Sequence, residues 1–119
     1  MKEFRIKEVN SMKVTSVIVI SSLLIFSGSA IAADGGTIYK DKCSMCHGPQ
    51  GAGTPMGPSI KGNEFITKGK ADEIRKVILE GRTGASKKYP KIPIDMPKMP
   101  MPDADVDALV IFLQGDLQK

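Results

Sequence analysis

The chain has 119 residues, a length that suits one small domain. Hydrophobic residues make up 41% and charged residues 25%, which is a globular balance and excludes a disordered chain. The formal charge of +4 is too small for a nucleic-acid binder, two cysteines cannot build a multi-disulfide scaffold, and one histidine excludes a two-histidine metal site.

The first 32 residues have the pattern of an export signal. Four basic residues lie in the first 13 positions, an apolar run follows over 14–26, and Ala30-Ile31-Ala32 supplies the small residues that signal peptidase requires. We therefore predict a signal peptide over 1–32, cleaved after Ala32, a domain over 33–119 and a periplasmic location. The alternative is a retained membrane anchor, but the apolar run is shorter than the ~20 residues that span a bilayer.

A helix is predicted over 36–43, and it runs directly into a C-x-x-C-H motif formed by Cys43, Cys46 and His47. This motif is the attachment signature of c-type haem, because two thiols on one helical turn can each add to a haem vinyl group. The adjacent histidine then supplies an axial nitrogen to the iron. The motif predicts one haem c, bound covalently through Cys43 and Cys46, with His47 as a metal ligand.

Two other readings of the cysteine pair are weaker. A thioredoxin-like redox pair would lie in a βαβ chain, and no strand pattern is present. A zinc site would need a fourth ligand, and the chain offers neither a third cysteine nor a second histidine.

The middle of the chain alternates loops with one helix. Glycines and prolines over 48–63 predict a loop. A helix is predicted over 71–80, where Ile74, Val77 and Ile78 share one face and Gly81 follows the end. Five prolines over 81–102 predict a long loop without regular structure, and such a loop in a small domain is normally functional.

The last helix has the clearest pattern. Asp103 is expected to cap it, Asp105 favours the positive helix end, and Gly115 marks its stop. One apolar face at helical spacing is formed by Val106, Leu109, Val110 and Leu113.

The motif and the glycine pattern after it resemble the small class I cytochromes c of bacteria. The residues that carry the resemblance are Cys43-Ser44-Met45-Cys46-His47-Gly48, then Gly51, Gly53 and Gly57-Pro58-Ser59-Ile60-Lys61-Gly62, with Ile60 where the family usually has leucine. The resemblance covers 36–113. It implies an all-α fold, the class I cytochrome c fold, with roughly three to four short helices and long loops around one covalent haem.

The same resemblance implies particular contacts. Gly36 and Tyr39 are expected to touch the last helix, with Gly36 allowing close approach, and Phe112 is expected to pack against the first helix. The carbonyl of Pro58 is expected to accept a hydrogen bond from His47, which would fix the orientation of the imidazole.

The sixth iron ligand is left open by the residues alone. His47 is the only histidine, so the opposite axial position is taken by methionine, lysine or water, or is vacant. Met96, Met99 and Met101 each precede a proline. The resemblance favours Met96, because it lies seven residues before Asp103, the spacing typical of the family. Met99, Met101 and an open site are the alternatives.

The resemblance implies electron transfer without catalytic residues. We expect a monomeric periplasmic carrier that passes single electrons between redox protein partners. The loop over 81–102 holds five basic residues against one acidic residue, which favours an acidic docking face on the partner, although it is also compatible with an ordinary lysine-rich surface. The basic residues are Arg82, Lys87, Lys88, Lys91 and Lys98. The alternatives are a cytochrome subunit docked on a dehydrogenase or oxidase complex, and an open-site haem enzyme or gas sensor.

Overall fold

A computed structural model describes residues 31–119, so the predicted signal over 1–32 lies outside the described residues except for its last two positions. The α-helices are α1 (Gly35–Lys42), α2 (Ser44–His47), α3 (Glu64–Thr67), α4 (Ala71–Glu80) and α5 (Asp103–Gln114). The 3₁₀ turn η1 (Gly84–Ser86) lies between α4 and α5, and a second, η2 (Asp116–Gln118), follows α5. The described part has no strands, only two isolated β-bridges, which confirms the all-α prediction. No helix of residues 31–119 has the length and apolarity to cross a membrane.

The three longer helices are those that the sequence predicts, and α4 has the predicted bounds. The one-turn helix α2 matches the helical turn expected for the motif, whereas the one-turn helix α3 was missed because four residues are too few to show a periodic pattern. Asn63 explains the start of α3, since its side chain accepts a hydrogen bond from the backbone nitrogen of Phe65 at 3.0 Å. A capping residue of this kind is the signal by which the helix could have been found.

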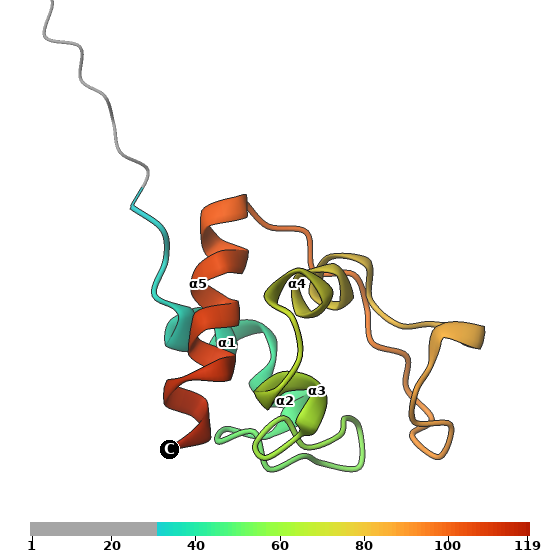
Figure 1. Ribbon diagram of the computed structural model, residues 1–119. Coiled ribbons are helices and arrows are strands. Elements are labelled where there is room, and N and C mark those ends of the chain that lie inside the picture. Colours follow the sequence, from blue (N-terminus) through green and yellow to red (C-terminus); the bar gives the residue numbers. More distant parts are fainter. Residues whose placement is uncertain (1–30) are drawn as a thin grey trace, which may run out of the picture.

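Helices α1 and α5 cross in direct backbone contact (Figure 1). A Cβ atom on Gly35 would lie 2.2 Å from the carbonyl oxygen of Ala108, so only glycine permits this approach. The expectation placed that role on Gly36, but a Cβ there would meet only side-chain atoms, Oδ2 of Asp34 at 3.1 Å and the ring of Phe112 at 3.2 Å. The aromatic contact is confirmed: the rings of Tyr39 and Phe112 have centroids 5.7 Å apart.

The core lies between α1, α4 and α5. All four residues of the predicted face of α5 are buried, and so are Ile74 and Ile78 of α4. Val77 is only half-buried, because it lies beside the cavity described below. The buried apolar residues are Ile38, Tyr39, Ile60, Ile66, Ile74, Ile78, Val106, Leu109, Val110, Leu113 and Leu117.

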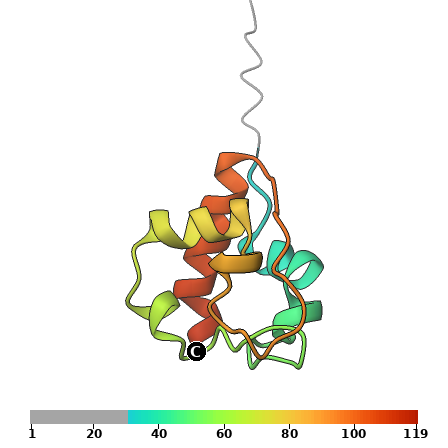
Figure 2. The same cartoon turned by 90° about the vertical axis from the view of Figure 1, so that its right-hand side faces the viewer.

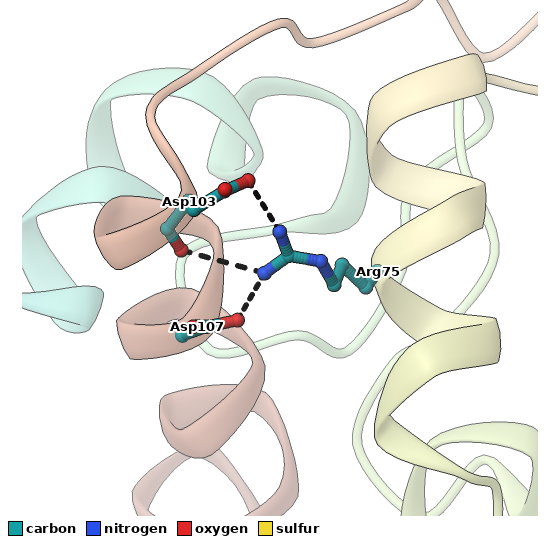
Figure 3. A network of polar contacts seen from close by, with 3 residues as sticks. All are labelled: Arg75, Asp103 and Asp107. Atoms are coloured by element: carbon teal, nitrogen blue, oxygen red, sulfur yellow. Dashed lines mark hydrogen bonds and ion pairs between the residues drawn. The ribbon is translucent and has the colours of Figure 1, made fainter.

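Arg75 of α4 joins the two helices that flank the long loop (Figure 3). Its guanidinium forms ion pairs with the carboxylates of Asp103 and Asp107, both on α5. The expectation that Asp103 caps α5 is wrong, since the N-cap residue is Pro102 and Asp103 lies inside the first turn. Its carboxylate is turned to Arg75 instead.

The segment 81–102 leaves α4, runs away from α5 and returns to its first turn (Figure 1). The view turned by 90° shows this segment in front of α4 and α5 (Figure 2). It is less irregular than predicted, since it contains η1 and an antiparallel bridge between Arg82 and Met96. The loop over 48–63 has no helix, as predicted.

Candidate functional site

An open cavity with mainly apolar walls lies between α2, α4 and the two long loops. The predicted site residues Cys43, Cys46, His47 and Met96 all line it. Its apolar walls include residues of the core itself, namely Ile60, Ile66, Ile74, Ile78 and Leu113. The fold therefore brings together residues that lie up to 53 positions apart (43 to 96) around one hydrophobic space.

His47 ends the one-turn helix α2, and its ring is oriented by the loop that follows. The Nδ1 atom lies 2.8 Å from the carbonyl oxygen of Pro58, as expected. A carbonyl can only accept, so Nδ1 carries the hydrogen and donates it. The lone pair is then left on Nε2, the nitrogen that is free to bind a metal.

Gly57 brings this loop against the motif. A Cβ atom on Gly57 would lie 2.6 Å from the carbonyl oxygen of Cys46 and 3.2 Å from Nδ1 of His47. Any larger residue would push the loop away and lengthen the bond between Pro58 and His47. The glycine is therefore part of the device that fixes the imidazole.

Cys43 and Cys46 are both free thiols, and both are partly buried. Burial raises the pKa of the Cys43 thiol to about 11, the nearby Lys42 opposes the rise, and Cys46 adds to it. Both thiols are free and line the cavity, as the addition of an S–H group across each of two haem vinyl groups requires. No group of three or more His, Cys, Asp or Glu residues that could hold a metal ion is found over 31–119.

Tyr39 is hydrogen-bonded to the residue that follows the motif. Its hydroxyl donates a 2.6 Å hydrogen bond to the carbonyl oxygen of Gly48, the residue after His47. Burial raises the pKa of Tyr39 to about 12, with a further contribution from Cys43. The phenol therefore stays protonated and keeps donating at any physiological pH.

Met96 reaches the cavity from the opposite loop. Its backbone nitrogen donates to the carbonyl of Arg82 at 3.1 Å, and its carbonyl accepts from the nitrogen of Arg82 at 2.9 Å. Gly81 has a φ of 69°, and a Cβ atom there would lie 2.4 Å from the Met96 carbonyl oxygen. Met96 is thus held at the backbone, and it is one of the residues that line the cavity.

The other methionines are placed differently. Met99 also lines the cavity, but it packs against the core and its nitrogen donates to the carbonyl of Ile78 at 3.0 Å. Met101 packs against the core and does not line the cavity. Met45 is 76% exposed, and Met56 lines the cavity mouth with 38% exposure.

Three of the five basic residues of the loop over 81–102 contact other side chains. The guanidinium of Arg82 lies 4.9 Å from the ring centroid of Phe65, and the ammonium of Lys88 lies 5.5 Å from the same centroid. Lys87 is 3.3 Å from a carboxylate oxygen of Asp95. Lys91 and Lys98 are exposed.

Two polar cavity residues were not singled out from the sequence. The amide nitrogen of Asn63 donates to the hydroxyl of Tyr89 and to the carbonyl of Ser59, both at 3.0 Å. These groups join the loop over 81–102 to the loop over 48–63 across the cavity wall. Nothing in their local sequence marks them, because the pair is 26 positions apart.

The residues present fit a haem c. Two thiols on one turn, a histidine with a free Nε2, an opposing thioether and a large apolar wall are the donor set and the surroundings that this group requires. The described residues also contain no buried side-chain polar atom without a partner that would be left facing the apolar ring.

Comparison with known proteins points to one family. The cytochrome c family model matches residues 32–115. A curated relative, the cbb3-type cytochrome c oxidase subunit FixP of Bradyrhizobium diazoefficiens, is 34% identical over 58 residues, or 48% of this chain and 20% of that protein. The chain therefore spans about a fifth of the length of this relative.

Two solved structures are similar to the fold. The c-type cytochrome XoxG from Methylobacterium extorquens AM1 has a TM-score of 0.53 and 20% identity, over 70% of this chain and 48% of that one. The KustC0563 c-type cytochrome has a TM-score of 0.49 and 25% identity, over 69% and 95% of the two chains.

Proposed function

Because the chain belongs to the cytochrome c family, we propose that it is a periplasmic carrier of single electrons between redox proteins. Family membership makes it a c-type cytochrome with one covalent haem c, and an electron-transfer protein instead of an enzyme. The bound haem supplies an iron that exchanges one electron between its ferric and ferrous states. The cellular location, the partners and the individual ligands are our proposal.

On this proposal Cys43 and Cys46 form the thioethers and His47 is the proximal ligand. The observation that supports it most directly is the 2.8 Å contact between Nδ1 of His47 and the carbonyl of Pro58. It leaves Nε2 unprotonated and fixes the ring beside both thiols. A ligand held in place before binding loses little orientational freedom when the iron binds.

We propose Met96 as the sixth ligand. Met96 lines the cavity, as Met99 does and Met101 does not. It differs from both neighbours because it is held by two backbone hydrogen bonds to Arg82 and is not packed against the core. Met99 would have to leave its core contacts to bind iron, and Met101 lies off the cavity. A thioether favours the ferrous state and raises the potential relative to a second histidine.

Export of the chain is supported by the segment around the proposed cleavage site. Residues 31–34 have no regular structure, and Ile31 is 94% exposed. A peptidase could therefore reach the bond between Ala32 and Ala33 without unfolding the domain. Haem attachment in bacteria takes place outside the cytoplasm, which requires such export.

A second candidate is a cytochrome module of a larger redox complex. It is favoured by the relative FixP, whose printed name places it in an oxidase. Gel filtration of the periplasmic fraction distinguishes the two: a free carrier elutes near its own mass, and a docked subunit elutes with its complex.

The test of the proposed function begins with mass spectrometry of the exported protein. We expect a chain from Ala33 plus one haem, and a Cys43→Ala or Cys46→Ala variant that loses most of its holoprotein yield. The oxidised protein should show the near-infrared band of methionine bound to ferric haem. A chain without haem, with a free or disulfide-linked cysteine pair, would contradict the proposal.

A further inference from the structure

The outer loop, which we define as residues 83–95, forms one wall of the cavity. Its base is closed by the two backbone hydrogen bonds between Arg82 and Met96. Within it, Pro90 and Pro93 carry no backbone N–H, so few main-chain bonds are available to hold its shape. Beyond η1, it has one main-chain bond, from the nitrogen of Ile92 to the carbonyl of Tyr89, at 3.1 Å.

Lys87 supplies the cross-link that the main chain lacks. Its ammonium donates a 2.7 Å hydrogen bond to the carbonyl of Ile92 and lies 3.3 Å from Oδ1 of Asp95. Only 19% of its side chain is exposed, which is low for a lysine. The side chain therefore crosses the loop from one side to the other, and ends on the residue just before Met96.

We propose that Lys87 is a positioning residue, which holds the segment 92–95 so that Met96 keeps its thioether at the sixth position of the iron. The inference rests on the proposed ligation by Met96. The bridge with Arg82 fixes the backbone of Met96 from one side, and the Lys87 link fixes the residues that enter it from the other. Two cross-links of this kind leave the ligand little freedom to move away.

A thioether is a neutral ligand, so its occupancy of the iron depends on how well the chain holds it in place. The apparent affinity of an added ligand rises in proportion to the fraction of molecules in which the site is open. Lys87→Gln removes the charged donor from a partly buried carbonyl, a change typically worth a factor of about 10 to 100 in an equilibrium. Water will recover part of this loss.

Lys91 provides the matched control. It lies in the same loop, carries the same charge and is exposed, and its side chain forms no hydrogen bond or ion pair with any of residues 31–119. Lys91→Gln thus removes the same charge without cutting the cross-link. Lys87→Arg keeps a charged donor that can still reach Ile92 and Asp95, and should restore the wild-type behaviour.

The experiment titrates the oxidised holoproteins with imidazole and follows the near-infrared methionine band. We expect Lys87→Gln to bind imidazole about tenfold more tightly than wild type and to lose part of the band. Lys91→Gln and Lys87→Arg should stay within about twofold of wild type. If Lys87→Gln yields too little holoprotein, Asp95→Asn, which weakens one of the two contacts, should tighten imidazole binding about threefold.

The outcomes separate this inference from the proposed function. A wild-type protein without the methionine band overturns ligation by Met96, and the role of Lys87 with it. A wild-type protein with the band, together with equal imidazole affinities for Lys87→Gln and Lys91→Gln, overturns the role of Lys87 alone. A lower melting temperature in Lys87→Gln with unchanged imidazole binding would also overturn it, since that is the signature of a purely structural side chain.

Discussion

The backbone nitrogen of Ala33 lies 3.0 Å from Oδ1 of Asp105, in the first turn of α5. In the uncleaved chain this is an amide hydrogen bond. If cleavage follows Ala32, the same nitrogen becomes an ammonium group, and the contact becomes an ion pair that joins the new N-terminus to α5.

We therefore predict a pH dependence of stability for the mature chain. A free α-amine has a pKa near 8, and pairing with a carboxylate favours its charged form in the folded state. The ion pair, worth about 0.5 kcal/mol, should be complete where the α-amine is charged and lost as the pH rises through its pKa. Chemical denaturation across the pH range around this pKa measures it. Asp105→Asn should abolish the difference, and an equal pH dependence in that variant would contradict the ion pair.

The three methionines of the loop can be separated by single substitutions. Met96→Ala should remove the near-infrared band, lower the midpoint potential and let carbon monoxide bind the reduced iron, because the sixth position is then open. Met99→Ala and Met101→Ala should keep all three properties close to wild type. A ligand-loss pattern in Met99→Ala, with Met96→Ala unaffected, would shift the ligand by three residues and show that the side-chain packing rearranges around haem.

Gly81 should be essential to the placement of Met96. Gly81→Ala combines an unfavourable positive φ with a contact of 2.4 Å to the Met96 carbonyl. Gly62→Ala is the control, because its φ is 72° and a Cβ atom there would meet no atom within 4 Å.

Both variants should lose about 1 kcal/mol of stability from the backbone strain. Only Gly81→Ala should lose a further 1–3 kcal/mol from the close contact, together with the methionine band. Thermal denaturation and the near-infrared spectrum measure the two effects. Equal losses in the two variants would show that the close contact relaxes freely.

Tyr39 should make the folded state sensitive to alkaline pH. Its pKa is about 12 when folded and near 10 when unfolded, so the unfolded chain loses its proton first. The stability from this group is complete below pH 10 and is lost as the pH rises to 12.

Tyr39→Phe removes this dependence, and it also leaves the Gly48 carbonyl without its donor, at a cost of about 1–3 kcal/mol at neutral pH. Urea denaturation at neutral pH and near pH 11 should therefore show a smaller difference between the two proteins at the higher pH. A difference that grows with pH would contradict the assignment.

Folding should depend on the haem. The cavity walls include core residues such as Ile74 and Leu113, so the apoprotein would expose part of its own core. A domain of this size buries too little surface to tolerate that loss. Circular dichroism of the apoprotein should show largely lost helix content. Native helix content without haem would show that the polypeptide core is sufficient.

The sequence predicted the helices with strong periodicity and the motif chemistry, because both depend on residues close together in the chain. The faces of α4 and α5 are of this kind, and Cys43 to His47 form one turn. The bond from His47 to Pro58 came from the family resemblance.

The rest depends on contacts that no local pattern encodes. Aspartate is a common N-cap residue, but the carboxylate of Asp103 pairs with Arg75, which lies 28 positions earlier in the chain, and does not cap α5. The close approach of α1 to α5 occurs at Gly35 and not at Gly36, because the relative position of the two packed helices determines which residue faces Ala108. Three repeated Met-Pro pairs look alike locally, and the long-range bridge to Arg82 is a structural feature that sets Met96 apart.

The ion pairs of Arg75 connect α4 and α5, the helices from which the loop over 81–102 departs and to which it returns. These ion pairs join the two helices independently of the segment between them. This separates a frame from an insert: the exposed side chains of the outer loop can be exchanged while the helix pair and the histidine side of the cavity keep their geometry. Grafting an outer loop from another protein onto this frame is the corresponding engineering strategy.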